Sequence, residues 1–216
     1  MKKRKVKNPH QPQAQQTNKM KRIINNKMKT TVRKNGQLFE KMDILAYFFE
    51  EPEREFHLRE IARLSGLAPS TISKYLTKLA AENVVISRKI RGLRIFKPNT
   101  ENKIYKYLKL FHNIMKIKSS GLLDYLTEEF NYPKAIILFG SFRKSENIPK
   151  SDIDLFIEAK TKKNPDLSRF EKKLNHPIQI FQFSSEEIQI MKTKNKELLN
   201  NIINGVLLEG YFEVFK

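Results

Sequence analysis

The spacing of apolar residues changes several times along the chain, and the first pattern typical of a folded unit begins at Leu38. The sequence LFEKMDILAYFFEEP repeats apolar residues at helical spacing until Pro52 ends the helix. A short strand, a helix over residues 58–64, a turn that contains Gly66 and a longer helix over residues 70–82 follow. The pattern therefore predicts two helices joined by a tight turn.

The next stretch, VVISRKIRGLRIFKP, predicts a β-hairpin with a basic tip, because two β-rich runs meet at Arg91-Gly92. Residues 100–119 then predict one more helix with an apolar stripe. Such a helix either packs between two domains or pairs with its copy in a dimer, but ordinary core packing explains the stripe most simply. The stripe consists of Ile104, Tyr107, Leu108, Phe111, Ile114 and Met115.

A second unit begins near residue 122, where helical and strand patterns alternate. After the helical GLLDYLTEEF, the run KAIILFGS predicts a strand that ends at Gly140-Ser141, and SDIDLFIEA and HPIQIFQF predict two more strands. A short helix over residues 166–174 is expected between these two strands. A long helix, capped by Ser185 and carrying Val206 and Leu207 in its apolar stripe, comes before YFEVF as a possible terminal strand.

These patterns favour an α+β protein with two domains in its 216 residues. We expect a basic arm without stable structure over residues 1–37, a first folded domain over 38–98, a linking helix over 99–121 and a second domain over 122–216. The second domain is expected to contain a small mixed sheet.

The charge of the chain points to a polyanionic partner. Lysine and arginine outnumber the acids by 42 to 23, and residues 1–39 hold twelve of these cations without any acid. This segment is interpreted as a phosphate-binding arm, and a solvated tail or an upstream start codon is the alternative.

Composition also excludes several classes of site. Cysteine is absent, so a disulfide framework or a thiolate metal site is impossible, and the four histidines show no ligand spacing. No apolar run is long enough for a membrane helix, and no apolar signal core is present. We therefore expect a cytoplasmic protein without membrane contact.

The helix over residues 70–82 leaves a small, polar and basic face uncovered. Short hydroxyl side chains let the backbone approach base edges, while lysines meet phosphates. The residues LREIARLSGLAPSTISKYLTKLAAENVVISRKIRGLRIFKPN resemble the winged helix-turn-helix family of prokaryotic regulators, although some winged helices serve only protein contacts. The resemblance implies contacts to double-stranded DNA from Ser70, Thr71, Ser73, Lys74, Lys78, Arg91 and Arg94.

Two aspartates carry the candidate chemistry of the second unit. Residues i and i+2 of a strand point to the same face, so Asp152 and Asp154 are expected to project together. Two carboxylates this close repel each other unless a cation lies between them. Because Mg²⁺ prefers carboxylates, water and phosphates as ligands, the pair predicts a Mg²⁺ or Mn²⁺ site.

A nucleoside triphosphate, ATP or another, is the substrate that this site predicts. Gly140 leaves the backbone bare and Ser141 offers a hydroxyl and an N–H, so phosphates can lie between this turn and the metal. Ser151 completes the predicted nucleotide-binding residues. The chain lacks a GxxxxGK[ST] loop, which favours nucleotidyl transfer over γ-phosphoryl transfer.

Gly140-Ser141, ten residues, then Asp152-Ile153-Asp154 resembles the pattern of the minimal nucleotidyltransferases in the DNA polymerase beta-like superfamily. The resemblance covers roughly residues 122–216 and implies that Asp152 and Asp154 are catalytic and bind the metal. It also implies a protein or small-molecule acceptor, since this branch includes antitoxins that modify a separate HEPN toxin. As a weaker, fold-level likeness, NIINGVLLEGY resembles the C-terminus of archaeal proteins that fuse the same two modules.

The sequence departs from that family where a third carboxylate is expected. The corresponding position on the next strand holds Gln179, with Gln182 nearby, and glutamine would hold a second metal poorly. Glu158, Glu186 and Glu187 are the possible substitutes, and none fits well. Three hypotheses therefore stay open: a DNA-bound nucleotidyltransferase, a regulator whose domain senses a nucleotide or acts as an antitoxin-type module, and a protein adaptor. A homodimer is possible in each.

Overall fold

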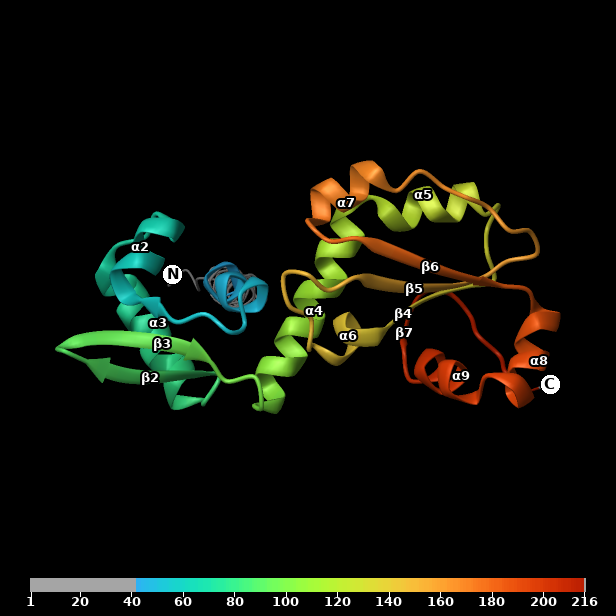
Figure 1. Cartoon of the computed structure of the whole chain (residues 1–216). Coiled ribbons are helices and arrows are strands. Elements are labelled where there is room, and N and C mark those ends of the chain that lie inside the picture. Colours follow the sequence, from blue (N-terminus) through green and yellow to red (C-terminus); the bar gives the residue numbers. More distant parts are fainter. Residues whose placement is uncertain (1–41, 216) are drawn as a thin grey trace, which may run out of the picture. The chain divides into compact units, whose positions relative to one another are not determined.

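The computed structural model of the chain describes residues 42–215, and Figure 1 shows their arrangement. The predicted basic arm, residues 1–37, lies outside the described residues. Residues 42–50 form a helix, as the spacing of apolar residues predicts. The next elements, in chain order, are β1 (Phe56–His57), α2 (Leu58–Ser65), α3 (Pro69–Ala81), β2 (Val85–Ile90), β3 (Leu93–Pro98) and α4 (Lys103–Ser120).

The helix-turn-helix unit is built around α2, α3 and a three-stranded antiparallel sheet with the order β1-β3-β2. Gly66 ends α2 in the left-handed region, with φ of 69°, and Pro69 occupies the first turn of α3, where its missing N–H costs nothing. The core of this unit is apolar and fully buried. It includes Phe48, Phe56, Ile61, Ile72, Leu76 and Phe96.

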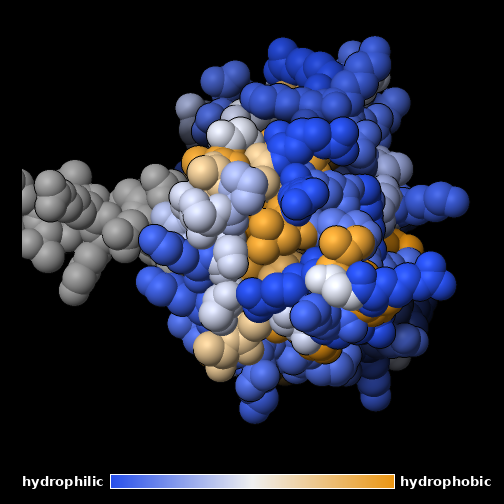
Figure 2. All heavy atoms as spheres, turned by 90° about the vertical axis from the view of Figure 1, so that its left-hand side faces the viewer, coloured by the Kyte–Doolittle hydropathy of each residue, from blue (hydrophilic) through white to orange (hydrophobic). Residues whose placement is uncertain are grey.

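The predicted hairpin is confirmed as β2 and β3, and its turn has the geometry of a two-residue hairpin loop. Arg91 and Gly92 both have positive φ, 48° and 83°, as such a loop requires. Ile86, Ile90 and Leu93 share one face of the hairpin and stay exposed. Figure 2, which looks from the helix-turn-helix side, shows hydrophobic residues gathered within a mostly hydrophilic surface.

The predicted burial of the apolar stripe on α4 is wrong. Four of its members are exposed, and Tyr107 is the most exposed at 70%. The buried face of α4 combines Tyr105 and Ile117 with the polar Lys109 and Asn113, which meet backbone and side-chain acceptors of the second unit. The exposed members are Ile104, Tyr107, Phe111 and Met115.

The second unit contains a four-stranded mixed sheet with helices on both faces (Figure 1). The strand order is β6-β5-β4-β7; β5 and β6 are parallel, whereas β4 is antiparallel to both of its neighbours. The elements are α5 (Leu122–Glu129), β4 (Ala135–Phe139), α6 (Gly140–Lys144), β5 (Ile153–Glu158), α7 (Ser168–Leu174), β6 (Ile178–Phe183), α8 (Ser185–Lys194), α9 (Lys196–Ile203) and β7 (Val206–Gly210).

Two apolar clusters, one on each face, hold this sheet. Ile153, Leu155 and Ile157 point into the cluster that α5 and α7 cover. Phe156 points the other way, into a cluster with residues of α8 and α9. Because β5 is buried on both faces, only its two ends can present polar groups to a ligand.

Three details of the C-terminal prediction are wrong. The expected long helix is broken at Asn195, whose side chain caps the start of α9 by accepting from the Leu198 N–H at 3.2 Å. Val206 and Leu207 belong to β7, so the terminal strand is VLLEG rather than YFEVF. Ser184, rather than Ser185, caps α8 in a capping box with Glu187.

Among residues 42–215, none of the helices is long and apolar enough to span a membrane.

Candidate functional site

The predicted site lies at the end of the sheet where β4 finishes and β5 begins. Phe139, the last residue of β4, pairs with Asp154 on β5, and Gly140 follows at once with φ of 68°. A side chain at position 140 would overlap the Asp154 carboxylate. A glycine is therefore required here for two reasons, the left-handed backbone and the close approach of the carboxylate.

The two aspartates lie close enough to influence each other. Asp154 is half-buried within β5, while the exposed Asp152 precedes the strand; β5 begins at Ile153, so the prediction that the strand SDIDLFIEA holds both aspartates is wrong for Asp152. Burial raises the pKa of Asp154 above its ordinary value, and the charge of Asp152 raises it further. A cation bound beside both carboxylates would relieve this repulsion.

The two serines predicted to bind the nucleotide, Ser141 and Ser151, have different surroundings. Ser141 lies in the first turn of α6, next to Gly140. The Ser151 hydroxyl accepts the Ile148 N–H at 2.9 Å, and the Ser151 N–H donates to the Ile148 carbonyl at 2.9 Å. Ser151 therefore shapes the loop that leads to Asp152.

His176 is a residue of this site that the sequence does not reveal. It is buried, its ring packs edge-on against Phe142 at 4.8 Å, and its Nδ1–H donates to the Ser151 carbonyl at 2.8 Å. Burial lowers the pKa of His176, which favours the neutral ring with Nδ1 protonated. His176 and Ser151 are 25 residues apart, so no short sequence pattern predicts this hydrogen bond.

Gln179 occupies the position beside Asp154 on the neighbouring strand, where the third carboxylate was expected. In the parallel pairing of β5 and β6, Asp154 and Gln179 are register partners, and Gln179 is exposed. The described residues contain no cluster of three or more acidic or histidine side chains that could hold a metal ion. Two carboxylates with open positions fit a single Mg²⁺ that also binds water and phosphate oxygens.

The possible substitutes for the third carboxylate are engaged elsewhere. Glu158 lies at the far end of β5, where it is paired with Lys134 and Ser185. Glu187 closes the capping box of α8, and Glu186 is its neighbour in the same first turn. Gln182 exchanges hydrogen bonds with the Lys163 backbone at 2.7 and 2.8 Å, so its role is local.

Polar residues of α4 hold α6 and the loop after it. The Asn113 amide donates to the Phe142 carbonyl at 2.9 Å and to the Asn147 side chain at 3.0 Å. Lys109 donates to the Asn147 carbonyl at 2.5 Å, and the Ser145 hydroxyl donates to a carbonyl of α4. These bonds fix the C-terminal side of α6, the helix that begins at Gly140.

Three of the five predicted DNA-contact residues of α3 lie on its exposed face. Ser70, Lys74 and Lys78 are exposed, whereas Thr71 and Ser73 are half-buried. The buried face of the same helix is apolar. One side of α3 therefore packs into the core, and the other side is accessible to phosphates and bases.

The β2-β3 hairpin, called the wing from here on, continues this surface. Arg94 on β3 donates to the Thr77 hydroxyl of α3 at 3.4 Å and lies over the Phe96 ring, so its guanidinium faces α3. Arg91 is exposed at the tip. Arg88 pairs with Glu55, which leaves it less suited to bind phosphate than Arg91.

Fold and site together define a helix-turn-helix unit joined to a mixed α/β domain with a glycine and two aspartates at one sheet end. Residues 42–86 match the family model described as IclR helix-turn-helix domain, and residues 122–210 match the model described as Polymerase beta, Nucleotidyltransferase. The chain thus contains an N-terminal helix-turn-helix DNA-binding domain and a C-terminal nucleotidyltransferase domain. Searches of curated proteins and of solved structures gave no significant match.

Proposed function

We propose that the C-terminal domain binds Mg²⁺ with ATP or another nucleoside triphosphate and transfers the nucleoside monophosphate to a hydroxyl of a protein or small molecule. The helix-turn-helix domain would meanwhile bind double-stranded DNA. The contact between Gly140 and the Asp154 carboxylate, beside Asp152, is the observation that carries this proposal. In this arrangement the Gly140 backbone, which can bind phosphates, lies beside the Asp152 and Asp154 carboxylates, which can bind the metal ion.

Each residue has a distinct part in the proposed transfer. Asp152 and Asp154 hold the cation, which offsets negative charge on the phosphates as the α-phosphorus is attacked. Gly140 and Ser141 hold the phosphate oxygens from the other side through the backbone and the Ser141 hydroxyl. His176 acts indirectly, because its hydrogen bond to Ser151 fixes the loop that presents Asp152.

A second candidate function is a regulator that senses the nucleotide without transferring it. The register of Gln179 with Asp154 favours this candidate, because an amide adds no charge to bind a second metal. The contacts of α4 also give bound nucleotide a physical connection to the DNA-binding domain, through α6 on one side and Tyr105 on the other. The two candidates share the nucleotide site and differ only in turnover.

The decisive experiment measures binding and transfer separately. Mg·ATP is titrated into the wild type and into Asp152→Asn/Asp154→Asn by calorimetry, and radiolabelled α-phosphate is followed in cell extract. We expect the double variant to lose binding at least about tenfold and to lose all labelling, since its neutral amides hold the cation poorly. Undiminished Mg·ATP binding by the folded double variant would refute the proposed site.

The Gln179→Asp variant separates the two candidates. Under the sensor hypothesis the wild type binds Mg·ATP without labelling any acceptor, and Gln179→Asp gains metal-dependent labelling because it restores the missing charge. Gln179→Asn is the matched control, since it also shortens the side chain but adds no charge. Labelling by the wild type itself would favour the transferase.

A further inference from the structure

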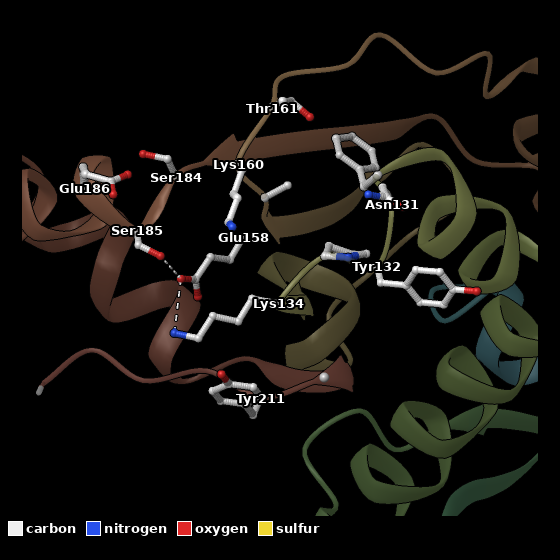
Figure 3. Close-up of a pocket in the computed structure, with 14 residues that line it drawn as sticks. Asn131, Tyr132, Lys134, Glu158, Lys160, Thr161, Ser184, Ser185, Glu186 and Tyr211 are labelled. Atoms are coloured by element: carbon white, nitrogen blue, oxygen red, sulfur yellow. Dashed lines mark hydrogen bonds and ion pairs between the residues drawn. The ribbon is translucent and has the colours of Figure 1, made fainter.

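A second cleft lies in the nucleotidyltransferase domain, at the sheet end opposite to Asp154 (Figure 3). Its volume is about 860 Å³. Glu158, in its wall, is four residues beyond Asp154 on the same strand, which corresponds to roughly 13 Å along the strand. The cleft is therefore separate from the proposed nucleotide site. Its polar lining includes Lys134, Glu158, Lys160, Ser185 and Glu186.

Glu158 is a buried carboxylate with an incomplete set of hydrogen bonds. The residue is 2% exposed, and its Oε1 accepts the Ser185 hydroxyl at 2.7 Å and the Lys134 ammonium at 3.3 Å. Its Oε2 is also buried, and no described residue donates to it. Burying a carboxylate oxygen without a donor is unfavourable, so a positively charged ligand group beside the Glu158 carboxylate would offset this cost.

An anionic group would find partners in the same cleft, next to Glu158. Figure 3 shows the Lys160 side chain directed toward Glu158, and its ammonium is in no ion pair within the described chain. The ten-residue helix α8 adds the positive end of a helix dipole at its first amide, Ser185, whereas the next amide, at Glu186, is already bonded to the Glu186 carboxylate. A simple anion is disfavoured, because the carboxylates of Glu158 and Glu186 would repel it.

The floor of the cleft is rigid and partly apolar. The Tyr211 N–H donates to the Lys134 carbonyl at 2.9 Å, and a side chain at position 210 would overlap the Lys134 backbone, so only glycine fits there. Lys134 lies 5.0 Å from the centre of the Tyr211 ring, which is exposed. Phe130 and Pro133 complete an apolar wall.

We propose that this cleft binds a small zwitterion, with free amino acids as its chemical class. The ligand's ammonium group is bound by Glu158, and its carboxylate is bound by Lys160 and the first turn of α8. An apolar or aromatic side chain fits against Phe130, Pro133 and Tyr211. The balance of two lysines and two glutamates in the lining matches a ligand with one charge of each sign.

The test uses the full chain and calorimetric titration of each of the twenty L-amino acids. We expect at least one of them to bind, and its N-acetyl derivative and its decarboxylated amine to bind at least about tenfold more weakly, because each lacks one charge. Inorganic phosphate and Mg·ATP serve as anionic probes. Phosphate that competes with the amino acid with equal affinity, or no binding of any amino acid, would overturn the proposal.

Variants assign the binding to the cleft. Glu158→Gln keeps the shape of the side chain, and we expect it to weaken amino-acid binding about tenfold or more. Lys160→Ala, at an exposed position, is also expected to weaken amino-acid binding. If Glu158→Gln does not fold, this variant alone tests whether the amino acid binds in the cleft. Unchanged affinity in Lys160→Ala would contradict the proposal.

Asp152→Asn/Asp154→Asn provides the control for the other site. The inference does not rest on the nucleotide site, so this double variant should bind the amino acid as the wild type does, whether or not it binds Mg·ATP. Loss of amino-acid binding in this variant would show that the ligand sits at the aspartates and would overturn the assignment to the cleft.

Discussion

At the scale of single residues, a glycine matters here because of what lies beside it. Gly140 and Gly121 both have φ in the left-handed region, 68° and 82°. A side chain at position 121 would meet open space, whereas one at position 140 would meet the Asp154 carboxylate. The same backbone requirement therefore has only a conformational consequence at position 121, whereas at position 140 it also places the backbone against the Asp154 carboxylate.

This difference predicts distinct effects for two alanine substitutions. Gly121→Ala should lower the free energy of unfolding by roughly 1–2 kcal/mol, the strain of a left-handed residue with a Cβ, and Gly140→Ala should lower it at least as much because its methyl group also overlaps the Asp154 carboxylate. Only Gly140→Ala should also weaken Mg·ATP binding, because the new methyl group displaces the Asp154 carboxylate. Urea unfolding and calorimetry check the two effects. Equal Mg·ATP affinity in the two variants would contradict the proposed role of Gly140.

At the scale of elements, α3 and the wing act as one surface. The hydrogen bond from Arg94 to Thr77 joins the hairpin to the recognition helix. Lys74 and Lys78 lie one turn apart on the exposed side of α3. Sequence periodicity shows which side of this helix is apolar, but only the structure shows that the wing extends its polar side.

Lys74 and Lys78 should contribute to the salt dependence of DNA binding. If each contacts a phosphate, Lys74→Ala/Lys78→Ala should lower the slope of log affinity against log salt by about 0.9 for each lysine. Fluorescence anisotropy with duplex DNA at several salt concentrations measures this slope. Lys172→Ala, an exposed lysine of α7, is the control and should leave it unchanged. An unaltered slope in the double variant would rule out these contacts.

The exposed stripe of α4 is the clearest case in which an element differs from its pattern. Apolar residues at helical spacing normally mark the buried side of a helix, yet here the buried side carries Lys109 and Asn113. A covering partner would explain the exposed side, so the homodimer stays a prediction.

At the scale of the whole molecule, α4 is bonded to both domains. Its Tyr105 hydroxyl donates to the Phe48 carbonyl at 2.9 Å, and His112 and Lys116 bind the Glu50 carboxylate at 3.0 and 2.7 Å. Burial opposes the charge of Glu50, but these two partners together lower its pKa to about 2. On its other side, the same helix holds the loop after α6 through Lys109.

Lys109 should make the stability of the molecule depend on pH. Burial lowers its pKa from 10.5 to about 8, although Glu50 opposes this shift. The unfolded chain therefore binds more protons between pH 8 and 10.5, so the lysine's contribution to the free energy of unfolding rises with pH across this window. Below pH 8 the buried charge destabilises the fold by up to ~3 kcal/mol.

The Lys109→Met variant isolates this contribution. Its free energy of unfolding minus that of the wild type should be largest below pH 8 and should shrink toward pH 10.5, as measured in urea at a series of pH values. Lys118→Met removes an exposed lysine of the same helix and controls for the loss of one charge. A Lys109→Met difference that stays constant with pH would contradict burial of the charged amine.

Short-range patterns in the sequence were enough to predict both domains and their order. The helical periodicity of residues 42–81, the Gly66 turn and the Arg91-Gly92 hairpin depend on neighbouring residues, and the structure confirms them. The spacing of Gly140 and the two aspartates predicted that they converge, because strand ends have fixed geometry. The boundaries near Asn195 and Val206 were missed, since the stretch reads as one helix until β4 pairs with β7.

Only the tertiary structure decided which distant groups meet. The sequence suggested that Gln179 takes the place of the third carboxylate, but only the strand register puts it beside Asp154. The bonds from His176 to Ser151, from Lys109 to Asn147 and from Ser185 to Glu158 join residues far apart in the chain. Such contacts depend on packing between elements, and no local pattern of residues encodes them.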